Sequence, residues 1–112
     1  MKKRRAKVGR GSGNIFADLG FKNADEELTK ASLTASIAKA VKKRRFKNQS
    51  EVAAVLGVDQ PKVSKLLRGH FAEYSVERLL SFLIRLGYDV KIEVADHAHR
   101  RRLGHVEVVE AA

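Results

Sequence analysis

The sequence predicts a mainly helical fold that ends in one β-strand, with a second strand candidate behind it. Three observations support this prediction. Residues 25–45 have helical apolar periodicity, two short capped segments flank Gly57, and residues 88–94 alternate between apolar and polar side chains. The chain has 112 residues, which fits one compact domain with tails and is too short for a multidomain enzyme.

The positive charge is concentrated in two blocks. The chain has 23 Lys and Arg against 13 Asp and Glu, a formal net charge of +10. One block lies in residues 2–10 and the other in residues 39–47, and the rest of the chain is near neutral. Dense cationic blocks are typical of contact with phosphate. The plainer alternatives are a solvated tail and a helix end whose cations favour the helix dipole.

Several classes of protein are excluded. The chain has no Cys, so it has no disulfide, thiolate metal site or Cys nucleophile. No stretch approaches the roughly 20 apolar residues that cross a bilayer, and no apolar run follows the basic N-terminus as in a signal peptide. We expect a cytoplasmic, nucleoid-associated protein without membrane contact.

The histidines raise the question of a metal site. His97, His99 and His105 lie near Asp96, but a loose His-x-His pattern without Cys in a cationic segment is more typical of a polar loop. No paired carboxylates, nucleophile–base pair or nucleotide loop is recognisable. We predict no enzyme activity, no cofactor and no metal.

The first twenty residues contain an arm and a short helical segment. Residues 1–13 are basic and glycine-rich, with almost nothing to bury, which predicts a flexible basic arm. Residues 14–20 can form one or two helical turns, too short to be stable alone. Their apolar side chains must dock on the domain's own core or on a partner: Ile15, Phe16 and Leu19.

A long helix is expected at residues 25–45, with acidic residues at its start and the basic block at its end. One apolar face repeats at a spacing of four: Leu33, Ile37 and Val41. A second, smaller face is formed by Leu28, Ala31, Ala35 and Ala38. The first face should pack into the core, and the second is either core or a subunit contact.

Residues 48–69 predict two short helices around a tight turn. Asn48 caps the first helix, and Glu51 completes a capping box. Gly57 supplies the left-handed backbone of the turn. Asp59 caps the second helix, and Pro61 lies in its first turn, where a missing N–H costs nothing.

The second of these helices has two different sides. At about 100° per residue, Val63, Leu66 and Leu67 share one side, and the opposite side is polar or cationic with no acid. A helix in the major groove of DNA needs such a side. The candidate base-reading residues are Gln60, Pro61, Lys62, Ser64 and Lys65. Gln60 suits adenine, Lys62 or Lys65 suits guanine, and Ser64 suits either base type. The candidate phosphate contacts are Arg68, Lys43, Arg44, Arg45 and Lys47, with Lys2, Lys3, Arg4, Arg5 and Lys7 on the arm.

The C-terminal third predicts a helix and then strands. Ser75 can cap a helix that ends at Gly87, with one strongly apolar face. Residues 88–94 form a strand, and residues 106–110 are a weaker strand candidate. Because two strands alone are marginal, we expect pairing across a dimer interface.

The run from Gln49 to Gly69, QSEVAAVLGVDQPKVSKLLRG, resembles the helix-turn-helix of the phage-repressor-like (Cro/CI, or XRE) family. The resemblance implies a lambda-repressor-like domain of five helices covering residues 30–87. It also implies that Gln49 braces a phosphate and the reading helix, that Gln60 leads the base readers, and that Pro61, Lys62 and Lys65 lie against DNA. Pro61 departs from the small polar residue that the family more often has.

A narrower likeness extends outside this domain. Residues 13–20, GNIFADLG, followed by an acidic helix start and a strand after the last helix, resemble HigA-type antitoxins. This resemblance implies autoregulation of an operon and binding to a RelE-like ribonuclease toxin, with Ile15, Phe16 and Leu19 as candidate docking residues. Packing of these three side chains on the domain's own core is the alternative.

The expected protein is therefore a repressor that binds double-stranded DNA sequence-specifically, as a homodimer on an inverted-repeat operator, and serves as the antitoxin of a toxin–antitoxin operon. The alternatives are a toxin-neutralising interaction module with secondary DNA binding, or a stand-alone phage-type regulator. The expected organisation is an arm at 1–13, a helical DNA-binding domain at 14–87 with the helix-turn-helix at 48–69, and C-terminal strands and a polar tail at 88–112.

Overall fold

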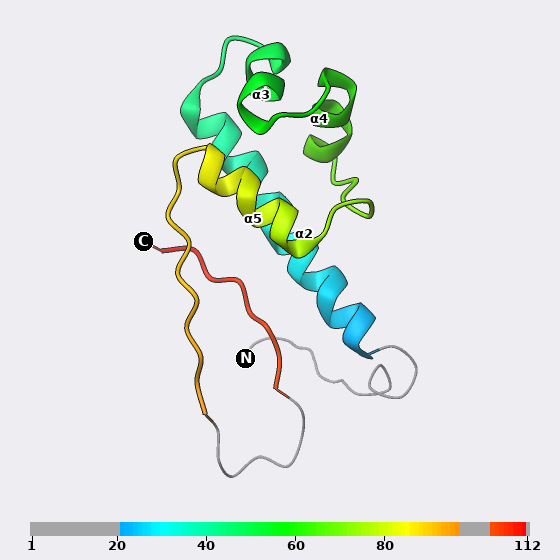
Figure 1. Cartoon of the computed structure of the whole chain (residues 1–112), viewed down its shortest axis with the longest axis vertical. Coiled ribbons are helices and arrows are strands. Elements are labelled where there is room, and N and C mark those ends of the chain that lie inside the picture. Colours follow the sequence, from blue (N-terminus) through cyan, green and yellow to red (C-terminus); the bar gives the residue numbers. More distant parts are fainter. Residues whose placement is uncertain (1–20, 97–103, 112) are drawn as a thin grey trace.

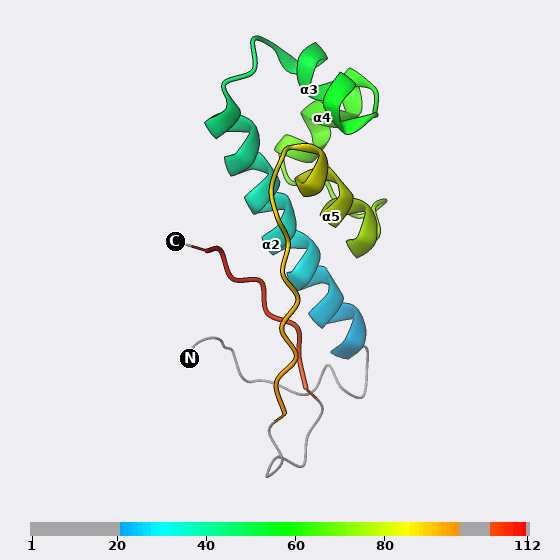
Figure 2. The same cartoon turned by 60° about the vertical axis from the view of Figure 1, so that its left-hand side comes forward.

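The computed structural model describes residues 21–96 and 104–111. This part of the chain forms four helices: α2 (Phe21–Arg44), α3 (Gln49–Leu56), α4 (Gln60–Leu67) and α5 (Val76–Arg85). Helix α5 lies along α2, and α3 and α4 pack together at one end of this pair (Figure 1, Figure 2). The mainly helical fold is confirmed. The arm at 1–13 and the short helix at 14–20 lie outside the described residues.

One apolar core joins the helices. Every helix contributes to it, and its fully buried side chains are Phe82, Ile37, Leu56, Leu66, Leu79, Val52 and Val63. The first apolar face of α2 packs into this core through Leu33 and Ile37. The second face of α2 does not, because Leu28 is 69% exposed. The core therefore uses only one side of α2.

The helix-turn-helix folds through local backbone signals. Asn48 Oδ1 accepts a hydrogen bond from the Glu51 N–H at 3.0 Å, so Asn48 caps α3. The Glu51 carboxylate accepts from the Lys47 N–H at 2.8 Å, one residue earlier than the Asn48 N–H of a capping box. At the turn, Gly57 has φ +76° and donates to the Ala53 carbonyl at 2.8 Å. These contacts place α3 and α4 as the sequence predicts.

The caps of α4 and α5 differ. Asp59 occupies the N-cap position of α4 with extended backbone, but its carboxylate makes no capping hydrogen bond. Ser75 Oγ accepts from the Arg78 N–H at 3.0 Å and caps α5. Gly87, at φ +89°, follows the end of α5, and a Cβ at this position would lie 3.2 Å from Arg44 Nη2. The backbone angle and the arginine both favour glycine there.

Helix α2 is longer than the sequence predicts. It begins at Phe21 rather than near Asp25, because acidic residues favour the first turn of a helix without fixing where it starts. It ends at Arg44, and Arg45 has a left-handed backbone with φ +56°. A left-handed residue stops the helix in the manner of a C-terminal glycine, although an L side chain is strained there.

The predicted C-terminal strands do not form within residues 88–96 and 104–111, the part of the C-terminal region that the structure describes. Residues 88–96 and 104–111 are drawn out without regular secondary structure (Figure 1). The alternation at 88–94 is typical of a strand with one apolar side, but a strand also needs a neighbouring backbone to pair with. Within the described residues, neither segment has such a partner.

The second of these segments lies along α2. Glu110 accepts hydrogen bonds from Ser36 Oγ at 2.8 Å and from Lys39 Nζ at 3.1 Å. These two hydrogen bonds, followed by the charge of Lys39, lower the pKa of Glu110. Val108, two residues before Glu110, is partly buried against the core. Residues 104–111 are therefore held on α2 mainly by polar contacts.

Candidate nucleic-acid interface

Helix α4 is fixed by its apolar side and exposes the other. Val63 and Leu66 are both 0% exposed, and Leu67 is half-buried. Gln60, Pro61, Lys62, Lys65 and Arg68 are exposed, and Ser64 is half-buried. The side that faces solvent carries no acid between Gln60 and Arg68. The helix thus presents a cationic surface whose orientation is set by the core.

The first turns of α3 and α4 are joined by a side-chain hydrogen bond. Ser50 Oγ donates to Gln60 Oε1 at 3.0 Å. The bond crosses the corner of the helix-turn-helix and fixes the amide of the first residue of α4. The neighbouring Gln49, the first residue of α3, is half-buried and lies beside this corner in sequence.

A second hydrogen bond lies at the other end of α4. Arg68 Nη1 donates to Ser64 Oγ at 2.8 Å. The guanidinium therefore lies back along the exposed side of the helix, one turn from its own Cα. Together with the Ser50–Gln60 bond, it orders the polar groups at both ends of this surface.

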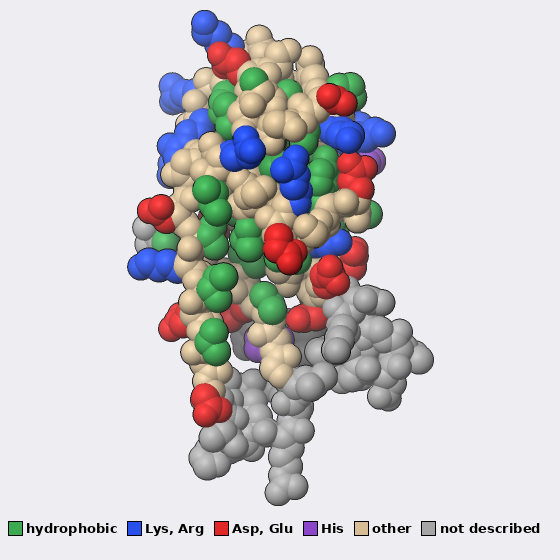
Figure 3. Space-filling view, in the orientation of Figure 1, with side chains coloured by type: hydrophobic (Ala, Val, Ile, Leu, Met, Phe, Trp, Pro, Cys, Tyr) green, Lys and Arg blue, Asp and Glu red, His purple; other side chains and the backbone are tan. Residues whose placement is uncertain are grey.

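The second basic block lies where α2 ends and the chain enters α3. Lys43, Arg45 and Lys47 are exposed there. In Figure 3, Lys and Arg side chains gather mostly in the upper half of the molecule, around α3, α4 and the end of α2, and acidic side chains lie mostly below. This separation gives one end of the described structure a positive surface.

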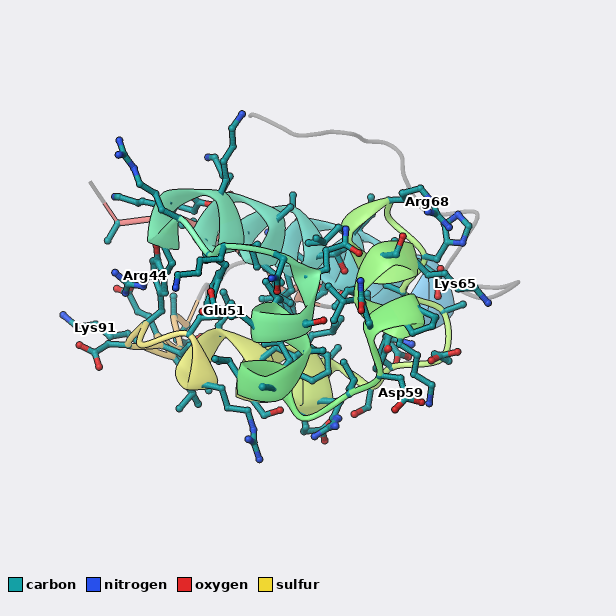
Figure 4. The ribbon with its side chains drawn as sticks, turned by 90° about the horizontal axis from the view of Figure 1, so that it is seen from above. Arg44, Glu51, Asp59, Lys65, Arg68 and Lys91 are labelled. Atoms are coloured by element: carbon teal, nitrogen blue, oxygen red, sulfur yellow. The ribbon has the colours of Figure 1, made fainter. Side chains whose placement is uncertain are left out.

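Arg44 belongs to this basic block in sequence, but its guanidinium is engaged by the end of α5. Its Nε donates to the Leu86 carbonyl at 2.9 Å, and Nη2 donates to the Gly87 carbonyl at 3.4 Å. Its guanidinium also lies 4.7 Å from the centroid of the Tyr88 ring. Figure 4 shows Arg44 on one side of the molecule and Lys65 and Arg68 on the other. Arg44 therefore holds the C-terminal end of α5 to α2, a role that its position in a basic run does not indicate.

A hollow of about 430 Å³ borders α4 on its loop side. Lys62 and Lys65 line it together with the loop at 69–74 and Glu27 of α2. Burial, and then the charge of Glu73, raise the pKa of Tyr74 in its wall. The carboxylates of Glu27 and Glu73 mark where the cationic surface ends.

Sequence reasoning missed Ser50 as a member of this site. It is an exposed serine in the first turn of α3, where nothing in its own neighbourhood distinguishes it from a solvent-facing residue. The available signal is the motif itself: the tight turn at Gly57 brings the start of α3 near the start of α4.

Two other kinds of site receive no support. None of the helices within residues 21–96 combines the length and the apolar character that crossing a bilayer requires. No group of three or more His, Asp or Glu side chains in the described ranges could hold a metal ion. His97 and His99 lie outside those ranges.

The fold and the exposed cationic helix define a helix-turn-helix protein of the DNA-binding class. A helix-turn-helix domain family model matches residues 15–95. A solved structure named "Putative XRE Family Transcriptional Regulator" is similar with a TM-score of 0.72 and 35% sequence identity, covering 80% of this chain and 99% of that chain. No curated protein matches the chain.

The chain belongs to the XRE-type helix-turn-helix family. The matched region includes all four described helices and the first C-terminal segment up to residue 95. The resemblance of residues 49–69 to this family is thereby confirmed, and the class of protein is a DNA-binding transcription regulator.

Proposed function

We propose that this protein is a transcriptional repressor that binds an inverted-repeat operator as a homodimer and places α4 in the major groove. The observation that carries the proposal is the cationic, acid-free side of α4, which is exposed while Val63 and Leu66 are 0% exposed. Phosphates flank the major groove, and base edges within it offer hydrogen-bonding groups, so such a surface suits both.

The side chains divide into base readers and phosphate contacts. The proposed readers are Gln60, Pro61, Lys62, Ser64 and Lys65, which lie along the outer side of α4. The proposed phosphate contacts are Gln49, Arg68, Lys43, Arg45 and Lys47. Arg44 is left out of the second group because its guanidinium is engaged by the end of α5. The arm cations at residues 2–7 add phosphate contacts in the proposal and lie outside the described residues.

Dimerisation is supported by apolar surface that one chain leaves uncovered. The exposed large apolar side chains lie on α2, α5 and the C-terminal segments: Leu28, Ile84, Val90, Ile92, Val94, Val106 and Val109. Residues 88–94 and 106–110 could pair as strands with a second subunit. Such pairing would bury the apolar side chains of the two segments and supply the backbone hydrogen bonds that a strand requires. A dimer that holds two reading helices about 34 Å apart matches successive major grooves on one face of DNA. Bound near a promoter, it would repress by occlusion.

The test is protection of the gene's own upstream DNA by the full chain. We expect two protected half-sites about one turn apart. Lys65→Ala should weaken operator binding by about 1–3 kcal/mol and change binding to unrelated duplex little. Lys91→Ala is the matched control, because Lys91 is exposed and far from Lys65 (Figure 4). Equal losses for Lys65→Ala on both DNAs would remove Lys65 from the base readers.

A second candidate function is neutralisation of a RelE-like ribonuclease toxin. It is supported by the outward face of α2, where Leu28 is 69% exposed and Ala31 and Ala35 are exposed beside it. The other docking candidates, Ile15, Phe16 and Leu19, lie outside the described residues.

Co-expression with the neighbouring reading frame tests this second function, provided that frame encodes a small basic ribonuclease-like chain. The full chain should relieve the growth arrest that the toxin causes. Leu28→Asp should abolish relief while operator binding persists. Relief that is unchanged by Leu28→Asp would exclude this face of α2 as the docking surface.

A further inference from the structure

We infer that the reading surface of α4 offers almost only hydrogen-bond donors, so that the operator half-site presents guanine to it. The inference rests on the proposed function, because it concerns which bases α4 reads. It comes from two side-chain hydrogen bonds, Ser50–Gln60 and Arg68–Ser64, each of which engages an oxygen of a proposed reader.

The first hydrogen bond changes what Gln60 can recognise. A glutamine amide carries one acceptor oxygen and two N–H donors, and it reads adenine by accepting from N6–H and donating to N7. In this structure Ser50 Oγ donates to Gln60 Oε1 at 3.0 Å. The oxygen is therefore engaged, and the donors remain for the DNA. Reading adenine with both groups would require Gln60 to share or break the bond to Ser50.

The second hydrogen bond acts in the same direction on Ser64. Arg68 Nη1 donates to Ser64 Oγ at 2.8 Å, so this oxygen already accepts a charge-assisted hydrogen bond. The one hydroxyl hydrogen of Ser64 remains to be donated. Ser64, which in isolation could bond to any base, is thereby biased towards an acceptor on DNA.

The remaining groups on this surface cannot accept at all. Lys62 and Lys65 carry only donors, and Pro61 has no polar side-chain atom. Helix α4 contains no Asp or Glu that could accept from cytosine N4 or adenine N6. The acceptor capacity that is left consists of the second lone pairs of two oxygens whose positions are already set.

Base edges respond differently to such a surface. In the major groove guanine presents two acceptors, N7 and O6, thymine presents O4 and a methyl group, adenine presents one acceptor and one donor, and cytosine presents a donor. A donor surface therefore favours guanine first and thymine second on the strand that it faces. The apolar ring of Pro61 fits next to a thymine methyl group.

The experiment is selection of binding sites from a pool of random duplexes by the full chain. We expect the enriched half-sites to contain guanine at two or more positions on one strand. In the selected site, replacement of these guanines by 7-deazaguanine, which removes N7, should lower affinity about 10- to 100-fold per base. Replacement by inosine keeps N7 and O6 and removes only a minor-groove amino group, so it should change affinity little.

Variants at Ser50 test its part as a positioning residue. Ser50→Ala releases Gln60 Oε1 and should raise the affinity for adenine relative to guanine at one position of the half-site, about tenfold. Ser50→Thr keeps the hydroxyl and should retain the wild-type preference. Ser81→Ala is the control, because the Ser81 hydroxyl donates within α5 to the Arg78 carbonyl. An unchanged preference in Ser50→Ala would show that the bond to Ser50 does not set what Gln60 reads.

The outcomes separate this inference from the proposed function. A selected half-site made only of A·T pairs, or one insensitive to 7-deazaguanine, would overturn the inference and leave the operator-binding function intact. Failure to enrich any sequence would contradict the proposed function itself and the inference with it.

Discussion

The helix-turn-helix at residues 48–69 and the chain after Gly87 differ in how far each is completed within one molecule. In the first region Leu56, Val63 and Leu66 are all 0% exposed and α3 is capped by Asn48. In the second, Ile92 is 80% and Val94 is 91% exposed, and neither described segment forms a strand. The first region packs into the core that all four helices share, whereas the second has the sequence of a strand and, within the described residues, no second strand to pair with.

Loss of an apolar side chain should destabilise the first region far more than the second. Leu66→Ala should lower the free energy of unfolding by about 2–5 kcal/mol, because it leaves a cavity in the core that the four helices share. Ile92→Ala should change the unfolding free energy of the monomer by less than about 0.5 kcal/mol. Urea denaturation at a protein concentration that keeps the chain monomeric measures both. Similar losses in the two variants would mean that the region after Gly87 is part of the monomer's core.

The next effect concerns association of two chains. Val94→Asp should weaken dimerisation by about 1–3 kcal/mol or more, because it would bury a charge in the proposed interface. Glu93→Gln is the control, since Glu93 lies on the other side of the alternating pattern and is exposed. Sedimentation equilibrium measures both dissociation constants. A dimer unaffected by Val94→Asp would place the interface elsewhere, with the outward face of α2 as the next surface to test.

Substitution of two adjacent arginines, Arg44 and Arg45, should change stability by smaller amounts and in opposite directions. Arg44→Ala removes contacts with Leu86, Gly87 and Tyr88 and should cost about 1–2 kcal/mol of stability, with no change in the salt dependence of DNA binding. Arg45→Gly relieves a left-handed backbone at φ +56° and should add about 0.5–1 kcal/mol of stability.

In DNA binding we expect a contribution from Arg45 and none from Arg44. Arg45→Gly should reduce the slope of log K against log salt by about 0.9, the value for one lost phosphate contact. The slope is measured by titrating salt in a binding assay on one duplex. A slope that falls for Arg44→Ala and not for Arg45→Gly would reverse the assignment of the two side chains.

The smallest effect is the pH dependence of the C-terminal contact with α2. The lowered pKa of Glu110 means that its hydrogen bonds to Ser36 and Lys39 are present above the ordinary pKa of a glutamate. They are lost as the pH falls through the lowered value. Chemical shifts of Ser36 and Lys39 should follow this titration in the wild type and not in Glu110→Gln. Glu107→Gln should leave the titration intact, and a titration that persists in Glu110→Gln would assign the contact to another group.

The sequence predicts the helix-turn-helix well because its signals are local. Asn48, Gly57 and Ser75 each act through backbone groups within four residues, and the apolar spacing of Val63 and Leu66 fixes which side of α4 is buried. An equally clear local pattern predicts the two strands. They do not form in the described segments because strand pairing requires a distant or separate backbone, which spacing within one segment cannot supply.

The candidate site is likewise predictable only where its signals are local. The exposed side of α4 follows from helical periodicity, but the contacts of Arg44 and Ser50 span 42 and 10 residues and depend on how helices pack. A basic run cannot distinguish Arg44, which turns towards Leu86, from Arg45, which faces solvent. Local sequence patterns therefore identify the exposed surface of α4, and tertiary packing determines which neighbouring side chains belong to the site.

In the proposed complex the outer side of α4 lies against the bases of each half-site. Since the chain has no Cys, Lys65→Cys provides a single attachment point for a DNA-cleaving reagent, and Lys91→Cys provides the control. We predict cleavage from position 65 in two clusters about 10 base pairs apart inside the protected region, and weak or scattered cleavage from position 91. Stronger cleavage from position 91, or no localised cleavage from position 65, would contradict the placement of α4 in the major groove.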